Sequence, residues 1–217
     1  MTVRSTRRLL LVGVGGLIAL VIAGNLVILG ASAWAKQTTP RLVVPQLTGV
    51  KNLEAVDAKL LRGAAPTEEG YRSLAANGVK VVVDLRAEPG VESDAELVRS
   101  LGMQPVRVPI RDGQIPSTEE VRQFLNVVQQ AGGPVFVHCG AGVGRTGAMV
   151  GAYLVSTGQL NGAGALRRNL AVGTPSLEQV TFVAGMGTSD ITKPPVAVTA
   201  LSRVIDAPRR IYHNLGF

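Results

Sequence analysis

Residues 134–147, PVFVHCGAGVGRTG, place an apolar run, a glycine-rich turn and a helix-forming segment in direct succession. The apolar run lacks polar alternation, which is typical of a strand that is covered on both faces. Three of the five residues between Cys139 and Arg145 are glycine, so the backbone can curl tightly before the helix begins. This order of strand, turn and helix indicates one unit of a layered α/β fold.

The same alternation of elements continues along the chain. Short runs rich in β-branched residues predict strands at 59–62, 80–86, 104–110 and 134–139. Helices are predicted from Thr67 to Gly78 and from a Ser-x-x-Glu capping box that begins at Ser117. Further helices are expected at 145–158, at 161–170 and at 176–184, where Ser176 and Gln179 complete a second capping box. We therefore predict an α/β fold with a central, mostly parallel sheet flanked by helices, plus one N-terminal transmembrane helix.

The N-terminal segment, residues 9–35, contains no charged side chain. As a helix it would measure about 40 Å, which exceeds the hydrocarbon core of a bilayer, about 30 Å thick. Three arginines precede it, and only Lys36 and Arg41 follow closely, so the positive-inside rule favours a cytoplasmic N-terminus and an extracytoplasmic domain. An Ala-Trp-Ala sequence that ends at Ala35 also fits cleavage of a signal peptide, but the apolar run is longer than a typical signal core. We expect a retained single-pass membrane anchor, with a signal segment as the alternative.

The rest of the chain divides by composition and charge. We expect a basic leader and anchor at 1–36, a linker at 37–50, and one globular domain at 51–190 that carries the function. A basic, apolar extension at 191–217 is expected to be loosely attached. The net charge of +7 comes from the two ends, so the central domain offers no basic face for nucleic acid. Basic ends instead suit anionic lipid head groups. A single cysteine excludes an intramolecular disulfide, and no metal site or cofactor is implied.

The glycine-rich turn has the features of an anion site. Its successive N–H groups can point at one centre, and the following helix adds the partial positive charge of its N-terminus, which suits a tetrahedral phosphoryl group. The same field favours the thiolate of Cys139. The guanidinium of Arg145 can hold two phosphoryl oxygens, and His138 is expected to orient the carbonyl groups of the turn. The predicted phosphate-binding residues are Gly140, Ala141, Gly142, Val143, Gly144 and Arg145.

The motif His-Cys-x5-Arg-Thr, filled here as HCGAGVGRTG, resembles the signature of the cysteine-dependent protein tyrosine and dual-specificity phosphatases. The resemblance extends loosely over residues 50–185. It implies that Cys139 attacks phosphorus to form a phosphocysteine, which water then hydrolyses. It also implies that Thr146 donates a hydrogen bond to the Cys139 sulfur, and that an Asp serves first as acid and then as base.

Asp112 is the candidate for this acid. It lies 27 residues before Cys139, after a predicted strand and beside Gly113, where the smaller dual-specificity members of the family carry theirs. Asp84, at the end of another strand, is the other candidate. We expect Asp84 instead to bond its neighbouring backbone or Arg86.

The substrate stays open between several classes. The loop carries no lysine of the kind that meets the additional phosphates of polyphosphoinositides, which favours a protein tyrosine or dual-specificity phosphatase. An extracytoplasmic domain keeps a membrane lipid or small-molecule phosphate as an alternative. A non-catalytic, membrane-anchored phosphate-binding module is the third hypothesis.

Overall fold

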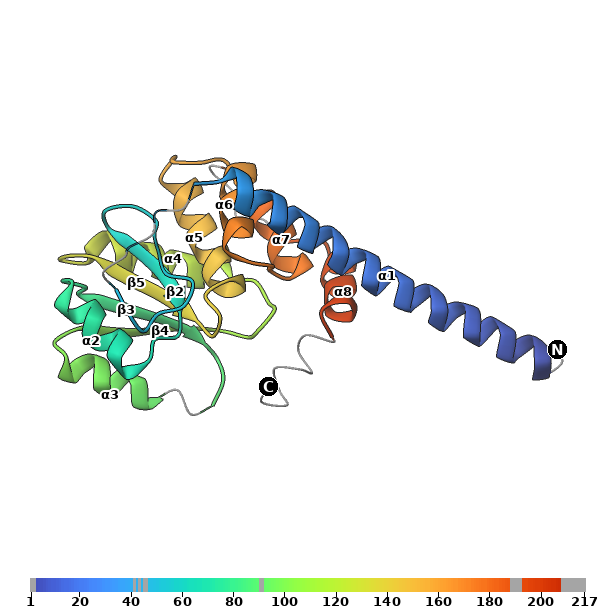
Figure 1. The fold of residues 1–217 in the computed structure, drawn as a ribbon, viewed down its shortest axis with the longest axis horizontal. Coiled ribbons are helices and arrows are strands. Elements are labelled where there is room, and N and C mark those ends of the chain that lie inside the picture. Colours follow the sequence, from blue (N-terminus) through green and yellow to red (C-terminus); the bar gives the residue numbers. More distant parts are fainter. Residues whose placement is uncertain are drawn as a thin grey trace.

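The computed structural model describes residues 3–40, 42, 44, 47–89, 92–187 and 193–207. Within them, a five-stranded sheet lies between layers of helices (Figure 1). The strands are β1 (Glu54–Ala55), β2 (Leu60–Ala64), β3 (Val81–Arg86), β4 (Gln104–Ile110) and β5 (Val135–Cys139), in the order β1-β2-β5-β3-β4. Only the short β1 is antiparallel to its neighbour. The predicted α/β fold with a mostly parallel sheet is confirmed.

The described part of the chain contains eight helices. They are α1 (Val3–Thr38), α2 (Glu68–Ala76), α3 (Glu92–Ser100), α4 (Thr118–Gln130), α5 (Gly144–Ser156), α6 (Gly162–Val172), α7 (Leu177–Ala184) and α8 (Val196–Ile205). Helices α2 and α3 cover one face of the sheet and α4 and α5 the other, with α6 and α7 packed beyond α5 (Figure 1).

The central strands explain why the sequence shows no polar alternation there. In β3, Val83 packs into the cluster that contains Phe124 of α4, whereas Val82 packs into the cluster that contains Tyr71 of α2. In β5, Val137 and Phe136 divide between the same two clusters. Both faces of these strands are therefore buried, so apolar residues are required at successive positions.

The predicted elements agree with the observed ones within a few residues at each end. Thr67 caps α2, and the capping box of Ser117 and Glu120 is present at the start of α4. Helices α3 and α8 and strand β1 were not predicted. Helix α3 carries few apolar residues, and β1 has only two residues.

Helix α1 is long and apolar enough to cross a membrane, a test that a signal sequence also passes. Its N-terminal part extends away from the rest of the chain, while its C-terminal part lies against α6 (Figure 1). Ala35 is fully buried in a small apolar cluster with Leu170 and Ala171. The Ser32 hydroxyl donates a 2.8 Å hydrogen bond to the carbonyl oxygen of Leu170. The last turns of α1 are thus part of the folded domain.

The expectation of a loosely attached C-terminal extension is wrong for residues 193–207. Helix α8 packs against α7 and α1. The backbone N–H of Glu178 donates to the Ser202 hydroxyl at 3.0 Å, and Ser202 in turn donates to Asp206 at 2.7 Å. Ser202 and Ile205 are buried. A buried polar side chain with both partners in place fixes α8 on α7, which composition alone does not reveal. Residues 188–192 and 208–217, including the basic pair Arg209 and Arg210, lie outside the described residues.

Candidate active site

The turn after β5 curls with its carbonyl groups directed outward. Its carbonyl oxygens at Gly140, Ala141 and Gly142 accept hydrogen bonds from the Ala65 backbone at 3.0 Å, the Asn52 side chain at 3.0 Å and the Arg62 guanidinium at 2.8 Å. In a planar trans peptide the C=O and N–H groups point in opposite directions. The N–H groups of residues 141–143 are therefore directed to the inside of the turn, next to the buried Cys139. This is the geometry of an anion-binding loop.

Gly142 meets a steric requirement of this loop. Its φ of +72° lies in the left-handed region, and a Cβ at this position would overlap the backbone of Gly63 and Ala64 in β2. Only glycine lets the loop approach the strand so closely.

Arg145 lies in the first turn of α5, beside Cys139, and is almost completely buried. Its two terminal nitrogens donate 2.8 Å hydrogen bonds to the two carboxylate oxygens of Glu88, and Nη1 also donates to the Ile110 carbonyl at 3.1 Å. Burial alone would lower the pKa of Arg145, but the hydrogen bonds and charge of Glu88 and the neighbouring Cys139 raise it, so the guanidinium stays charged. The same bonds from Arg145 outweigh burial and lower the pKa of Glu88.

Two buried donors in the first turn of α5 have no hydrogen-bond partner within the described chain. These are Nε of Arg145 and the hydroxyl of Thr146, which is itself fully buried. Buried donors are normally satisfied, and unsatisfied ones point to a missing ligand or partner. Glu88 occupies the guanidinium edge formed by the two terminal nitrogens. The edge that includes Nε is therefore the one available to an incoming anion.

Asp112 joins these residues in one cleft. Its carboxylate lies 3.3 Å from Nη2 of Arg145, and its side chain is 54% exposed. The loop that carries it is held by the start of α7: the Ser176 hydroxyl donates to the Gly113 carbonyl at 2.9 Å, and the Gln179 amide donates to the Gln114 carbonyl at 3.0 Å. Gln179 also forms the predicted capping box with Ser176. Arg145 thus lies next to both Asp112 and Cys139 in the structure.

The second candidate acid, Asp84, lies elsewhere. Its carboxylate accepts hydrogen bonds from the backbone and the guanidinium of Arg86, as expected from the sequence. Burial alone would raise the pKa of Asp84, but the bonds from Arg86 lower it.

His138 is completely buried, and burial is the main reason why its pKa falls to about 4. The ring is therefore neutral at pH 7. Its Nδ1 lies 3.4 Å from the Cys139 carbonyl oxygen, within reach of a hydrogen bond. A neutral ring in this place can orient a carbonyl group but supplies no charge.

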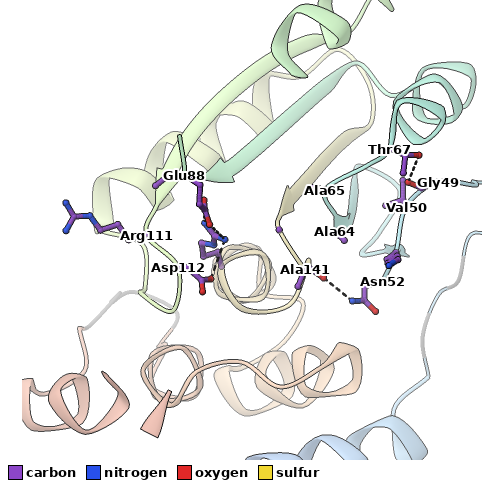
Figure 2. Close-up of a pocket in the computed structure, with 14 residues that line it drawn as sticks. Gly49, Val50, Asn52, Ala64, Ala65, Thr67, Glu88, Arg111, Asp112 and Ala141 are labelled. Carbon is purple, nitrogen blue, oxygen red and sulfur yellow. Dashed lines mark hydrogen bonds and ion pairs between the residues drawn. The ribbon is translucent and has the colours of Figure 1, made fainter. Parts of the chain in front are cut away.

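A cleft of about 980 Å³ is lined by Glu88, Asp112 and Arg145 and by Gly140 and Ala141 of the anion-binding loop. Figure 2 shows Glu88 and Asp112 directed toward the same point, whereas Arg111 points away from them. Lys51 and Asn52 also line the cleft, and Figure 2 shows Asn52 on the side away from Glu88. The cleft is large enough for a phosphorylated side chain or a lipid head group.

The sequence did not identify three residues that hold the loop or Arg145 in place: Glu88, Arg62 and Asn169. Glu88 follows β3 at the carboxyl edge of the sheet, where ligand sites of parallel sheets form, so its place was a usable signal. Arg62 is a charged residue inside an apolar strand, and it bonds Asn169 at 3.0 Å as well as the loop. Asn169 fills the space beside Gly147 and carries no sequence signal of its own.

Comparisons with known proteins agree with this geometry. The family described as "DSP-PTPase phosphatase fused to NAD+ Kinase" matches residues 42–185. The chain belongs to this phosphatase family. The resemblance to cysteine-dependent tyrosine and dual-specificity phosphatases is thereby confirmed at the level of the superfamily.

Individual relatives match over shorter stretches. Probable NAD kinase 2, chloroplastic, from Oryza sativa subsp. japonica is 36% identical over 104 residues, which are 45% of this chain and 10% of the relative. The tyrosine-protein phosphatase CDC14 homolog of Schizosaccharomyces pombe is 34% identical over 82 residues, 37% of this chain and 15% of the relative. The chain thus spans only a small part of the length of these relatives.

Solved structures show the same fold at low identity. The core catalytic domain of the PP-IP phosphatase SIW14 from S. cerevisiae has a TM-score of 0.56 at 17% identity and covers 67% of this chain and 91% of its own. TpbA of P. aeruginosa, solved in complex with pTyr, has a TM-score of 0.53 at 21% identity and covers 77% and 98%.

Proposed function

We propose that this phosphatase hydrolyses phosphomonoesters through a phosphocysteine on Cys139. The observation that carries the proposal is the arrangement around Arg145: it lies beside the buried Cys139, and it lines one cleft with Asp112 and with Gly140 and Ala141 of the anion-binding loop. In the first step the Cys139 thiolate attacks phosphorus and the bond to the leaving oxygen breaks. Asp112 gives its proton to that oxygen.

Arg145 acts on the transferred group through the edge that Glu88 leaves open. Nε and one terminal nitrogen would hold two phosphoryl oxygens, while Glu88 keeps the guanidinium plane in place.

The second step releases inorganic phosphate. Water attacks phosphorus, Asp112 accepts the proton from water, and the phosphorus–sulfur bond breaks. The Thr146 hydroxyl, which has no hydrogen-bond partner among the described residues, would donate to the departing sulfur and stabilise it as a thiolate.

The preferred substrate class is the phosphorylated protein side chain, phosphotyrosine or phosphoserine and phosphothreonine. The uncharged loop positions and the family support it. A lipid monophosphate is the second candidate, because α1 would anchor the domain as a single-pass membrane protein whose catalytic domain lies outside the cytoplasm.

The test is hydrolysis of para-nitrophenyl phosphate by the full chain in detergent, measured against pH in the presence of a chelator. Cys139→Ser should abolish turnover, Arg145→Lys should reduce it strongly, and Asp112→Asn should flatten the basic limb of the profile. Glu119→Gln, an exposed change on α4, should match wild type. Folded wild type that binds phosphate without turnover would refute the proposal in favour of a non-catalytic binding module. A phosphotyrosine peptide and a lipid monophosphate in mixed micelles, assayed next, separate the two substrate classes.

A further inference from the structure

One face of helix α8 packs against α1 and α7. Ser202 and Ile205 are buried, and the side-chain amide of Asn25 in α1 donates a 3.1 Å hydrogen bond to the carbonyl oxygen of Ile205. The Ile205 side chain also lies against Gly24, where a Cβ would be 3.0 Å away. The position of α8 along α1 is therefore set by residues 24 and 25.

The opposite face of α8 is apolar and exposed. Val196 is 85% exposed and Val204 is 40% exposed, and Ala197 and Ala200 lie exposed between them at helical spacing. The charged side chains next to this face within the described residues are both basic, Lys193 and Arg203, and both are exposed. We call the surface formed by Val196, Ala197, Ala200 and Val204 the α8 face.

The level of the α8 face relative to a bilayer follows from the length of α1. The uncharged run begins at Leu9, so Asn25 lies about 24 Å further along the helix axis. The hydrocarbon core is about 30 Å thick, and the zone of head groups extends several ångströms beyond it on each side. If Arg7 and Arg8 mark one surface, the contact with α8 falls close to the opposite surface. Figure 1 shows α8 between the sheet and the protruding part of α1, as this requires.

We propose that α8 is an interfacial helix whose exposed apolar face lies in the surface of the bilayer, with Lys193 and Arg203 at the level of anionic head groups. The combination of an apolar stripe, flanking cations and a fixed contact with a membrane-spanning helix is what such a helix requires. The start of α8 also adjoins the loop that carries Asp112, because Pro194 and Val196 line one groove with Arg111 and Gln114. The catalytic cleft is thereby held at a fixed orientation close to the lipid surface.

The proposal rests on α1 as a membrane anchor and is tested together with it. Cys139 is the single cysteine, so Cys139→Ser gives a background for single labels. Ala200→Cys, Val204→Cys, Ile18→Cys and Gln130→Cys are each labelled with an environment-sensitive fluorophore. The full chain is reconstituted in phosphatidylcholine vesicles with or without phosphatidylglycerol. Quenching is then compared for lipids that carry a nitroxide near the head group or near the chain end.

The expected result distinguishes the four labels. Labels at 200 and 204 should be quenched most by the nitroxide near the head group, and more strongly with phosphatidylglycerol. The label at 18, in the exposed part of α1, should be quenched most by the deep nitroxide, and the label at 130, at the far end of α4, by neither. Quenching at 18 without quenching at 200 and 204 would overturn the interfacial helix and leave the anchor intact. A blue-shifted but unquenched label at 200 would overturn it in favour of contact with a second copy. No quenching at 18 would overturn the anchor and this proposal, without affecting the proposed chemistry.

Discussion

Replacing Glu88 with Gln turns one of the two oxygens that hold Arg145 into an amide nitrogen, which cannot accept a hydrogen bond. The pair has two 2.8 Å bonds, each to a charged donor, and the variant keeps one of them. Hydrogen bonds to charged groups contribute roughly 1.5–3 kcal/mol, and the Glu88 side chain is 47% exposed, so the lower end of this range applies. If Arg145 stabilises the transition state, about 1.5 kcal/mol corresponds to about a tenfold fall in kcat/KM.

The assay is steady-state hydrolysis of para-nitrophenyl phosphate, with kcat and kcat/KM measured separately. Glu68→Gln is the matched control, because Glu68 also bonds an arginine, Arg72, but on the exposed surface of α2. We expect kcat and kcat/KM to fall together for Glu88→Gln and to stay unchanged for Glu68→Gln. An increase in kcat/KM for Glu88→Gln would refute the reasoning, because Glu88 would then compete with the phosphoryl group for Arg145.

Three further predictions follow from particular residues. Gly142→Ala should abolish phosphate binding, measured by titration, and turnover, measured by hydrolysis, because the new Cβ would overlap β2. The control Gly78→Ala, at a φ of +82° in open space, should keep both. Equal activity of the two variants would contradict the loop geometry. His138 is neutral when folded, with a pKa of about 4 against 6.5 when exposed, so the unfolded chain binds the extra proton between these values. The free energy of unfolding should therefore fall by about 3 kcal/mol as the pH drops through this window. Chemical unfolding measured at several pH values should show a weaker dependence of this free energy on pH for His138→Gln. Ala35→Arg places a charge in the buried cluster between α1 and α6 and should lower the free energy of unfolding by about 3 kcal/mol or more, seen as a lower Tm in detergent. Ala33 is exposed, so Ala33→Arg should leave Tm unchanged. Equal Tm values for the two variants would show that α1 does not pack against the domain.

The elements that could be predicted from the sequence are those with a local cause. The apolar runs of β3 and β5 report burial on both faces, and the capping boxes at Ser117 and Ser176 report hydrogen bonds within a few residues. The loop after Cys139 is also local, because its glycines and Arg145 act within one turn of chain. Asp112 could be named as a candidate because it follows a predicted strand, beside Gly113, where the family that the loop resembles carries its acid.

The features that could not be predicted depend on contacts between distant segments. The pairing of Glu88 with Arg145 joins residues 57 positions apart, and the bond from Arg62 to the Gly142 carbonyl joins residues 80 apart. The docking of α8 depends on Ser202 meeting the backbone of Glu178, which has no signature in composition. Periodicity reports which side of a helix is buried, and it does not identify the partner.

The central claim is that Cys139 carries the phosphoryl group during turnover. The most direct measurement is rapid acid quench of the full chain with excess phosphomonoester, followed by mass spectrometry of the intact protein and of the peptide that contains Cys139. We predict a gain of one phosphoryl mass on that peptide in wild type, and none in Cys139→Ser. Turnover without any covalent intermediate, or a phosphoryl group on another residue, would contradict the account.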